Sequence, residues 1–308
     1  MRALVFPGQG SQAVGMCRDL YERHAAVREV YAEAADVLGY NVAAVTFEGP
    51  ADRLMQTYVT QPALLVASIA VLRVAEEKGL SYQAALGHSL GEYTALVAVG
   101  ALRFADAVRL VRRRGEVMQA AAEEHPGGMA AVLGLNDQAV EELCVGIGEL
   151  WPANYNAPGQ VVVSGAVSAL DDLTRRAADA GARRVVRLPV SGAFHSPYMA
   201  TAAVALRPSL EKARWSPPAR PFFSVSTVAF DDGGRPASFA ALLERQITAP
   251  VRFAQSVRAL IASGCDEFLE VGPGAVLSGL IKRIDASVRV ARVGDVPTLD
   301  ALITGERG

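Results

Sequence analysis

Ser89 stands in the pentapeptide Gly87-His88-Ser89-Leu90-Gly91, which matches the pattern G-x-S-x-G. A short apolar run precedes the pentapeptide and a helical pattern begins near Glu92, so the serine is expected where a strand turns into a helix. Glycines on both sides permit a tight turn, which exposes the hydroxyl at the helix N-terminus, where developing negative charge is favoured. The pattern therefore predicts a nucleophilic serine at position 89.

A serine hydroxyl needs a base to take its proton, and the chain has four histidines, His24, His88, His125 and His195. His88 is a poor base because adjacent side chains on a sharp turn point apart. His24 lies in a polar, surface-like helix, and His125 lies in a Pro-Gly loop. Elimination leaves His195, just after a predicted strand, as the base.

Acyl transfer through a serine also needs backbone N–H donors that stabilise an oxyanion. The residue after the nucleophile, Leu90, supplies one amide. Gln9, in the glycine-rich turn after the first predicted strand, can supply the second. The alternative for this turn is that Gly8 and Gly10 only shape the chain.

Arg114 ends a run of three arginines on the helix predicted after the Ser89 helix. Helical spacing sends three consecutive side chains in three directions, so at most one or two of them can face a common cleft. A guanidinium holds a carboxylate through two parallel hydrogen bonds, which suits an acyl group that ends in a free carboxylate. By spacing alone, the arginine fits a solvated helix face as well.

The elements that must position these residues form two groups. Residues 129–190 show the order strand, helix, strand, strand, helix, strand, which is that of a ferredoxin-like unit. The sequence therefore predicts a small domain at residues 126–190, inserted into a large domain formed by residues 1–125 and 191–308. In the large domain we expect strands at 2–6, 84–86 and, as the last one, 265–271, helices at 27–38, 62–78 and 106–122, and surface loops at 217–218 and 231–234.

The composition is that of an ordinary globular chain of 308 residues with a formal net charge of -2. This balance provides no whole-chain field that would favour nucleic acid or an anionic membrane as partner. Pro7 interrupts the first apolar run, so we expect no export signal, and residues 62–72 are too few to span a bilayer. Three distant cysteines fit neither a disulfide framework nor a paired zinc site. We expect a soluble cytoplasmic protein.

Seven blocks occur in order along nearly the whole chain: FPGQGSQ at 6–12, TQPA at 60–63, GHSLGEY at 87–93, RGEVMQ at 114–119, NYNAPGQ at 154–160, GAFHS at 192–196 and VGPG at 271–274. With these blocks the chain resembles malonyl-CoA:acyl carrier protein transacylases. That family includes stand-alone enzymes of bacterial fatty-acid synthesis and the acyltransferases of polyketide synthases. The resemblance implies an α/β, hydrolase-like large domain with a parallel sheet and a ferredoxin-like insertion.

The resemblance also implies roles for individual residues. Ser89 would carry the acyl ester, His195 would act as base and then as acid, and Arg114 would grip the malonyl carboxylate. The amides of Gln9 and Leu90 would hold the oxyanion.

Three further positions follow from the resemblance. Gln246 would orient the histidine through its backbone carbonyl, in place of an aspartate side chain. Phe194 resembles the malonyl-selecting type, because its bulk leaves little room for a 2-methyl branch. Met118, in the same block as Arg114, would contact the substrate.

The implied reaction is ping-pong: malonyl-CoA acylates Ser89, and the phosphopantetheine thiol of an acyl carrier protein then takes the malonyl group. It requires no metal and no tightly held cofactor, and a monomer is expected. Carrier proteins are usually acidic, so we expect the docking surface for the carrier to include basic residues. The candidates, which fit an ordinary solvated surface equally well, are Arg183, Arg184, Arg187, Lys282 and Arg283.

Two other functions compete with this reading. One is an acyl hydrolase that clears carrier proteins on the same machinery, and Arg114 argues against it because a carboxylate clamp has little use for plain acyl chains. The other is a non-catalytic scaffold that binds acyl carriers or pathway enzymes, and the presence of Ser89, His195 and Arg114 together argues against it.

Overall fold

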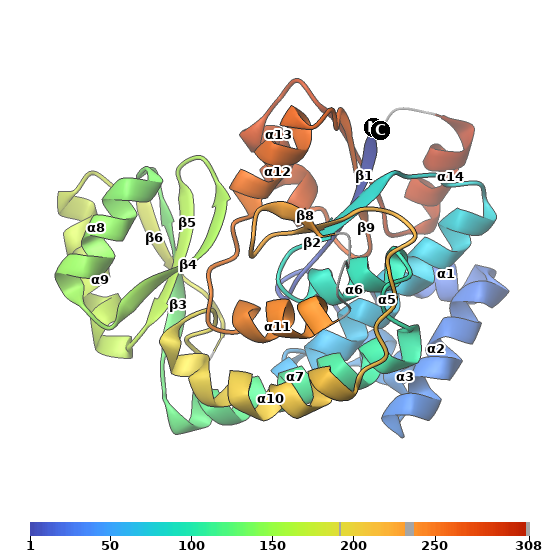
Figure 1. Ribbon diagram of the computed structural model, residues 1–308, viewed down its shortest axis with the longest axis horizontal. Coiled ribbons are helices and arrows are strands. Elements are labelled where there is room, and N and C mark those ends of the chain that lie inside the picture. The colour runs from blue at the N-terminus through green and yellow to red at the C-terminus, as the bar shows by residue number, and fades with distance from the viewer. Residues whose placement is uncertain (191, 232–236, 306–308) are drawn as a thin grey trace.

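The protein consists of a large and a small unit that lie side by side (Figure 1). The computed structural model describes residues 1–190, 192–231 and 237–305. The predicted domain boundary at 191 and the predicted loop residues 232–234 lie outside these ranges.

A six-stranded sheet forms the centre of the large unit, in the order β10-β9-β1-β2-β7-β8. Its inner strands are short apolar runs that are buried on both faces, as parallel strands usually are. All neighbouring pairs are parallel except β7 with β8. The strands are β1 (Arg2–Phe6), β2 (Ala84–Gly87), β7 (Phe222–Ser224), β8 (Ala229–Asp231), β9 (Glu267–Val271) and β10 (Arg289–Val293).

The strand prediction for the large unit is right at its centre and wrong at its edges. β1, β2 and β9 occupy the predicted runs, but β9 is not the last strand, and Asp231 ends β8 instead of starting a loop. The missed strands β7 and β8 have three residues each, and most of β10 is exposed. Such short or half-exposed segments lack the continuous apolar run that identifies a buried strand.

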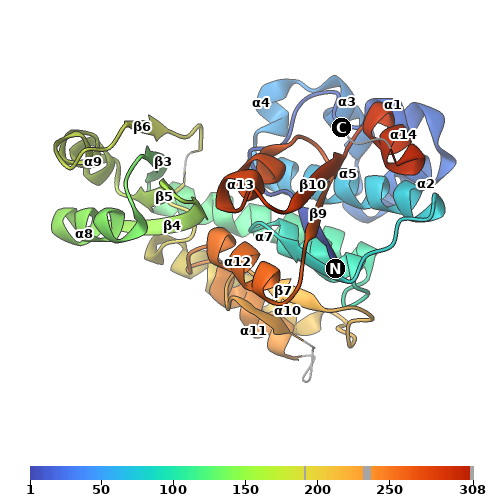
Figure 2. The ribbon, with the colours of Figure 1, turned by 90° about the horizontal axis from the view of Figure 1, so that it is seen from above.

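Helices cover both faces of the large sheet (Figures 1 and 2). Those that bear on the site are α5 (Thr57–Glu77), α6 (Gly91–Ala98), α7 (Phe104–Glu124), α11 (Ala237–Gln246) and α13 (Val276–Ile284). The others are α1 (Arg18–Arg23), α2 (Ala25–Leu38), α3 (Val42–Glu48), α4 (Ala51–Leu54), η1 (Pro197–Met199), α10 (Ala200–Lys212), α12 (Phe253–Ala262) and α14 (Val296–Thr304).

Helix α5 starts five residues before the predicted position and is fully helical through Pro62. Among the described residues it is the one helix long and apolar enough to cross a membrane, with a hydropathy of 1.5. However, 89% of its most apolar window is buried inside the protein. This burial is that of a core helix, against which α2 and α7 pack.

The small unit is a four-stranded antiparallel sheet in the order β4-β5-β3-β6. Its elements follow the predicted ferredoxin-like order, although β6 ends at Arg187 and not at 190. Both helices lie on the side away from the large unit (Figures 1 and 2). The elements are β3 (Gly128–Leu133), α8 (Asp137–Ile147), β4 (Leu150–Ala157), β5 (Gln160–Gly165), α9 (Val167–Asp179) and β6 (Arg184–Arg187).

Alternation along the small sheet divides its side chains between two cores. Val161 and Val163 pack with α8 and α9, whereas Val162 and Met129 face the large unit. The edge strand β4 is also tied to the large unit, because Tyr155 N donates to Val251 O at 2.9 Å. The inner face of the small sheet is thereby held over the carboxyl ends of β1 and β2.

Candidate active site

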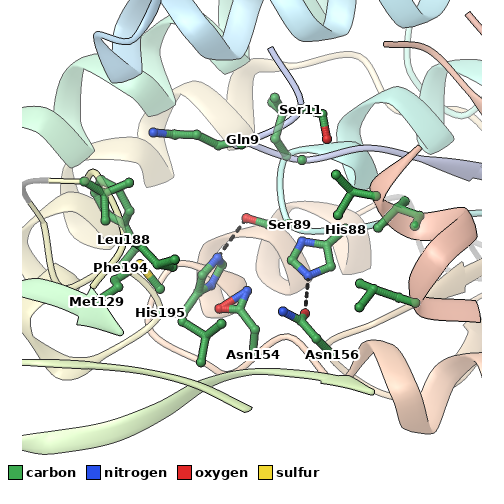
Figure 3. Close-up of a pocket in the computed structure, with 18 of the residues that line it drawn as sticks. Gln9, Ser11, His88, Ser89, Met129, Asn154, Asn156, Leu188, Phe194 and His195 are labelled. Atoms are coloured by element: carbon green, nitrogen blue, oxygen red, sulfur yellow. Dashed lines mark hydrogen bonds between the residues drawn. The ribbon is translucent and has the colours of Figure 1, made fainter. Parts of the chain in front are cut away.

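A cavity of about 180 Å³ lies between the two units, at the carboxyl ends of β1 and β2. The large unit contributes the loop at residues 8–11, Ser89, Arg114 and His195. The small unit contributes Met129, Val162 and two asparagines from β4. Figure 3 shows that Ser89 and His195 point toward each other across this space.

Ser89 occupies a strained turn between β2 and α6. Its φ is 54°, in the left-handed region that non-glycine residues rarely adopt. The flanking glycines are required by space, because a Cβ on Gly87 would lie 1.8 Å from the carbonyl carbon of Gly91. A Cβ on Gly91 would lie 2.1 Å from Phe6 O. The sequence pattern thus produces the sharp turn that lifts the serine hydroxyl into the cavity.

His195 is placed as a base for Ser89. Its Nε2 lies 2.8 Å from Ser89 Oγ, and its Nδ1 lies 2.9 Å from Gln246 O and 3.1 Å from Ala249 O. A carbonyl oxygen only accepts, so Nδ1 carries the proton and Nε2 is left with a lone pair for the serine hydroxyl. Burial, together with the nearby charge of Arg114, lowers the pKa of His195 to about 3, so the free imidazole is neutral near pH 7.

Arg114 is buried beside the serine, with 1% of its surface exposed. Nη1 donates to Gln61 Oε1 at 2.9 Å, and Nη2 donates to Ser89 Oγ and to Gln246 Oε1, both at 3.0 Å. Within the described residues, its Nε has no hydrogen-bond partner. The two preceding arginines lie on the surface and pair with Glu116. One of the three arginines therefore points inward, which agrees with the limit set by helical spacing.

The two amides predicted for an oxyanion hole border the cavity. Gln9 and Leu90 both line it, and in the part of the chain that the structure describes neither N–H donates to a protein acceptor. The Gln9 loop packs directly on the serine turn, because a Cβ on Gly8 would lie 2.5 Å from His88 O. Both N–H groups are thus available to a ligand in the cavity.

Apolar side chains form the wall opposite the nucleophile. Phe194 and Met118 line the cavity, together with Met129 and Leu188. Phe194 is 7% exposed and Met118 is 2% exposed, so both are held firmly by their surroundings.

Three polar residues of the site are not among those predicted from the sequence: Asn154 and Asn156 of the small unit and Gln61 of α5. His88 Nε2 lies 2.8 Å from Asn156 Oδ1, which joins the serine turn to β4. Asn154 lines the cavity, and its buried Oδ1 has no partner among the described residues. Gln61 holds Arg114. Gln61, Asn154 and Asn156 all lie in sequence blocks that carry the family resemblance, and membership of these blocks is the sequence signal that identifies them.

The basic residues considered for docking are all exposed. Arg184 and Arg187 are the first and last residues of the edge strand β6, and Arg183 directly precedes it. Arg187 pairs with Asp171 at 2.6 Å. Arg283, at the end of α13, donates to the carbonyl of Pro158, so this helix end touches the β4–β5 turn. None of the five lines the cavity.

A serine on a strand–helix turn, a neutral histidine within reach of it and two free amides define a serine acyl-transfer enzyme of α/β fold. The family model for the acyl transferase domain matches residues 3–299. The malonyl CoA-acyl carrier protein transacylase of Salmonella typhimurium is 42% identical over 306 residues, which is 98% of each chain. The enzyme of that name from Bacillus subtilis is 41% identical over 305 residues, covering 98% of this chain and 96% of the relative.

Solved structures agree over the whole fold. The acyl-carrier-protein-S-malonyltransferase of Bartonella henselae superposes with a TM-score of 0.94 at 38% identity, covering 99% of each chain. A malonyl-transacylase solved in complex with a type II PKS acyl-carrier protein superposes with a TM-score of 0.95 at 39% identity, again over 99% of each chain. The chain belongs to the malonyl-CoA:acyl carrier protein transacylase family, and the predicted fold class is confirmed.

Proposed function

We propose that this protein transfers a malonyl group from malonyl-CoA to the phosphopantetheine thiol of an acyl carrier protein, through an ester on Ser89. One observation carries the proposal: Ser89 Oγ lies 2.8 Å from His195 Nε2 and 3.0 Å from Arg114 Nη2. A base and a buried cation at one hydroxyl suit a thioester whose acyl group also carries a free carboxylate. The malonyl carboxylate is separated from the reacting carbonyl by one methylene, so its cation must lie this close to the nucleophile.

In the first half-reaction, His195 Nε2 accepts the Ser89 proton while Oγ attacks the thioester carbonyl. The oxyanion that forms points at the N–H groups of Gln9 and Leu90. The C–S bond then breaks, and the departing CoA sulfur takes the proton back from His195. Throughout, the carbonyl of Gln246 accepts from Nδ1–H and stabilises the imidazolium while it exists.

The second half-reaction runs the same steps in reverse with a different thiol. The phosphopantetheine thiol of the carrier gives its proton to His195 and attacks the Ser89 ester, and Ser89 recovers its proton as the malonyl thioester leaves. These steps use only groups of the chain and its two substrates, so they need no metal or cofactor.

Phe194 and Met118 would make the site selective for an unbranched acyl group, because their buried side chains fill the space that a 2-methyl branch needs. One methyl group is worth about 1–3 kcal/mol in such a pocket, so the preference is expected to be large but not absolute. We place the reaction in the cytoplasm, in fatty-acid or polyketide synthesis, and expect a monomer.

The exposed basic residues of β6 and of the end of α13 are the proposed dock for the acidic carrier. Val276 and Leu280 of α13 line the cavity, and Lys282 and Arg283 end the same helix. At α13, a carrier held there would lie within two turns of side chains that line the cavity.

Mass spectrometry of the intact protein after incubation with malonyl-CoA tests the proposal. Wild-type protein should gain one malonyl group, and Ser89→Ala should gain none. Addition of holo acyl carrier protein should then move the group to the carrier. Release of free malonate in place of transfer would support the hydrolase, and a wild-type protein without adduct would support the scaffold.

A further inference from the structure

Gln246 connects the three groups of the proposed site through its side chain as well as its backbone. Its carbonyl holds His195, its Oε1 accepts from Arg114 Nη2 at 3.0 Å, and its Nε2 donates to Ser89 O at 2.9 Å. The same Nε2 donates to Glu92 Oε2. The side chain is fully buried, so no water competes for these contacts.

Glu92 is the one group in this set whose role is unexplained. It lies in α6, one turn after the nucleophile, and has no exposed surface. Its Oε1 accepts from Val225 N at 2.9 Å and its Oε2 accepts from Gln246 Nε2. A buried carboxylate is costly unless it is paired, and the nearest buried cation is Arg114, one amide group away.

We infer that Glu92 is a positioning residue for the malonyl clamp: it fixes the Gln246 amide so that its oxygen faces Arg114, and it balances the guanidinium charge through that amide. The inference rests on the proposed function. When ionised, the carboxylate only accepts, so it requires the NH₂ end of Gln246, and the oxygen of the amide must then face the guanidinium. Burial raises the pKa of Glu92 to about 7, so this constraint is complete above that pH, where the acyl preference is to be measured. Each group in the series from Glu92 to Arg114 thereby has one allowed orientation.

Substitution by glutamine removes this constraint with almost no change in shape. A glutamine at 92 has one oxygen for two N–H donors, Val225 N–H and Gln246 NH₂. The Ser226 hydroxyl, 3.5 Å from Oε2, can donate or accept and so does not decide the orientation. If the oxygen of the new glutamine faces Val225, the Gln246 amide must rotate, which turns its NH₂ toward Arg114 and its oxygen toward the carbonyl of Ser89. If the oxygen of the new glutamine faces Gln246, its NH₂ faces Val225 N–H. Two buried donors then lie against each other without an acceptor. Either arrangement disturbs the amide that holds Arg114, while the backbone carbonyl that holds His195 stays in place.

The acyl preference of the enzyme is the readout that separates this role from a merely structural one. Malonyl-CoA needs Arg114 and acetyl-CoA does not, so the ratio of their kcat/KM values for acylation of Ser89 reports on the clamp. In Glu92→Gln we expect this ratio to fall about tenfold, because roughly one charge-assisted hydrogen bond is lost. Acetyl transfer should change little.

Glu270→Gln is the matched control. Glu270 is also fully buried, and its two oxygens also accept from two backbone N–H groups, those of Leu277 and Ser278. This variant should lose stability as Glu92→Gln does, with an unchanged malonyl-to-acetyl ratio.

A double-mutant cycle shows whether Glu92 acts through Gln246. In Gln246→Ala the backbone carbonyl for His195 remains, the ratio should fall about as far as in Glu92→Gln, and adding Glu92→Gln should lower it no further. If Glu92→Gln does not fold, the malonyl-to-acetyl ratio of kcat/KM in Gln246→Ala still tests the inference.

A ratio within twofold of wild type in Glu92→Gln or in Gln246→Ala would overturn the inference. Equal losses in the Glu270→Gln control, or a full additional effect of Glu92→Gln in the Gln246→Ala background, would do the same. Wild-type protein is measured first, because absence of a malonyl ester there would defeat the proposed function itself.

Discussion

Replacement of Arg114 by methionine should separate the clamp from the acyl-transfer chemistry. Methionine is shorter than arginine but keeps an unbranched apolar stem, and it removes the donors that contact Gln61, Ser89 and Gln246. Because Arg114 is 1% exposed, its pairing with a bound carboxylate is poorly screened by water.

The expected size of the effect follows from that burial. Loss of one partner of a buried, hydrogen-bonded charge pair costs about 2–5 kcal/mol, which is about 30-fold to a few thousand-fold in kcat/KM. Malonyl-CoA should lose this amount in Arg114→Met. Acetyl-CoA has no carboxylate, so its kcat/KM should change by less than about fivefold, since Ser89, His195 and the two amides remain.

The assay is acylation of Ser89 by each CoA ester, followed by intact-mass spectrometry or CoA release. Arg113→Met is the matched control, because Arg113 is the exposed neighbour on the same helix and forms its ion pair with Glu116. It should leave both substrates within twofold of wild type. Equal losses for malonyl-CoA and acetyl-CoA in Arg114→Met would refute the clamp, and so would an unchanged rate with malonyl-CoA.

Three further outcomes are expected. Phe194→Ala should raise the methylmalonyl-to-malonyl ratio of kcat/KM about tenfold or more, measured by competition between the two CoA esters; an unchanged ratio would show that Phe194 does not limit the branch. The folded pKa of His195, about 3, lies below its ordinary 6.5, so the unfolded chain binds the extra proton and His195 destabilises the fold as pH falls from about 6.5 to 3. Between pH 6.5 and 3, the free energy of unfolding of His195→Asn should therefore fall by less than that of wild type, by up to a few kcal/mol, in urea titrations. Equal falls in the two proteins would contradict a neutral histidine in the fold. The double variant Lys282→Glu/Arg283→Glu should raise the KM for the carrier at least threefold and weaken its salt dependence, with little change in acylation by malonyl-CoA; Arg175→Glu on α9 is the control, and equal effects of the two would place the dock elsewhere.

The site residues that sequence predicts best are those whose neighbours must be of one type. Ser89 was identifiable because the close approaches at Gly87 and Gly91 admit no side chain, which leaves a visible pattern. His195 was reached by elimination among four histidines, and its distance from Ser89 Oγ agrees with that choice. Arg114 could not be selected from its run by spacing alone, because the direction of the cleft is set by how α7 packs on α5.

The groups that sequence reasoning missed act through contacts that leave little pattern. The carbonyl of Ala249, which holds His195 together with that of Gln246, is missed because a backbone carbonyl is present at every position, whatever the side chain. The Gln246 carbonyl follows only from the family resemblance. Asn154 and Asn156 reach the cavity only because β4 is the edge strand tied to Val251. The missed strand β10 fails for a related reason, since it lies at the edge of the sheet and is half exposed.

The clamp and the base are coupled by charge, and this coupling bears on how the Arg114→Met result divides between kcat and KM. Burial and, after it, the charge of the Arg114 guanidinium lower the pKa of His195, which makes the imidazole a weak base. In the proposed function, a malonyl carboxylate on Arg114 would neutralise that charge and so raise the basicity of His195 when the correct acyl group is bound. Acetyl-CoA leaves the guanidinium charge uncompensated, so wild-type enzyme should use it with a lower kcat as well as a higher KM. In Arg114→Met the charge is gone, so the difference in kcat between the two esters should narrow together with the difference in KM.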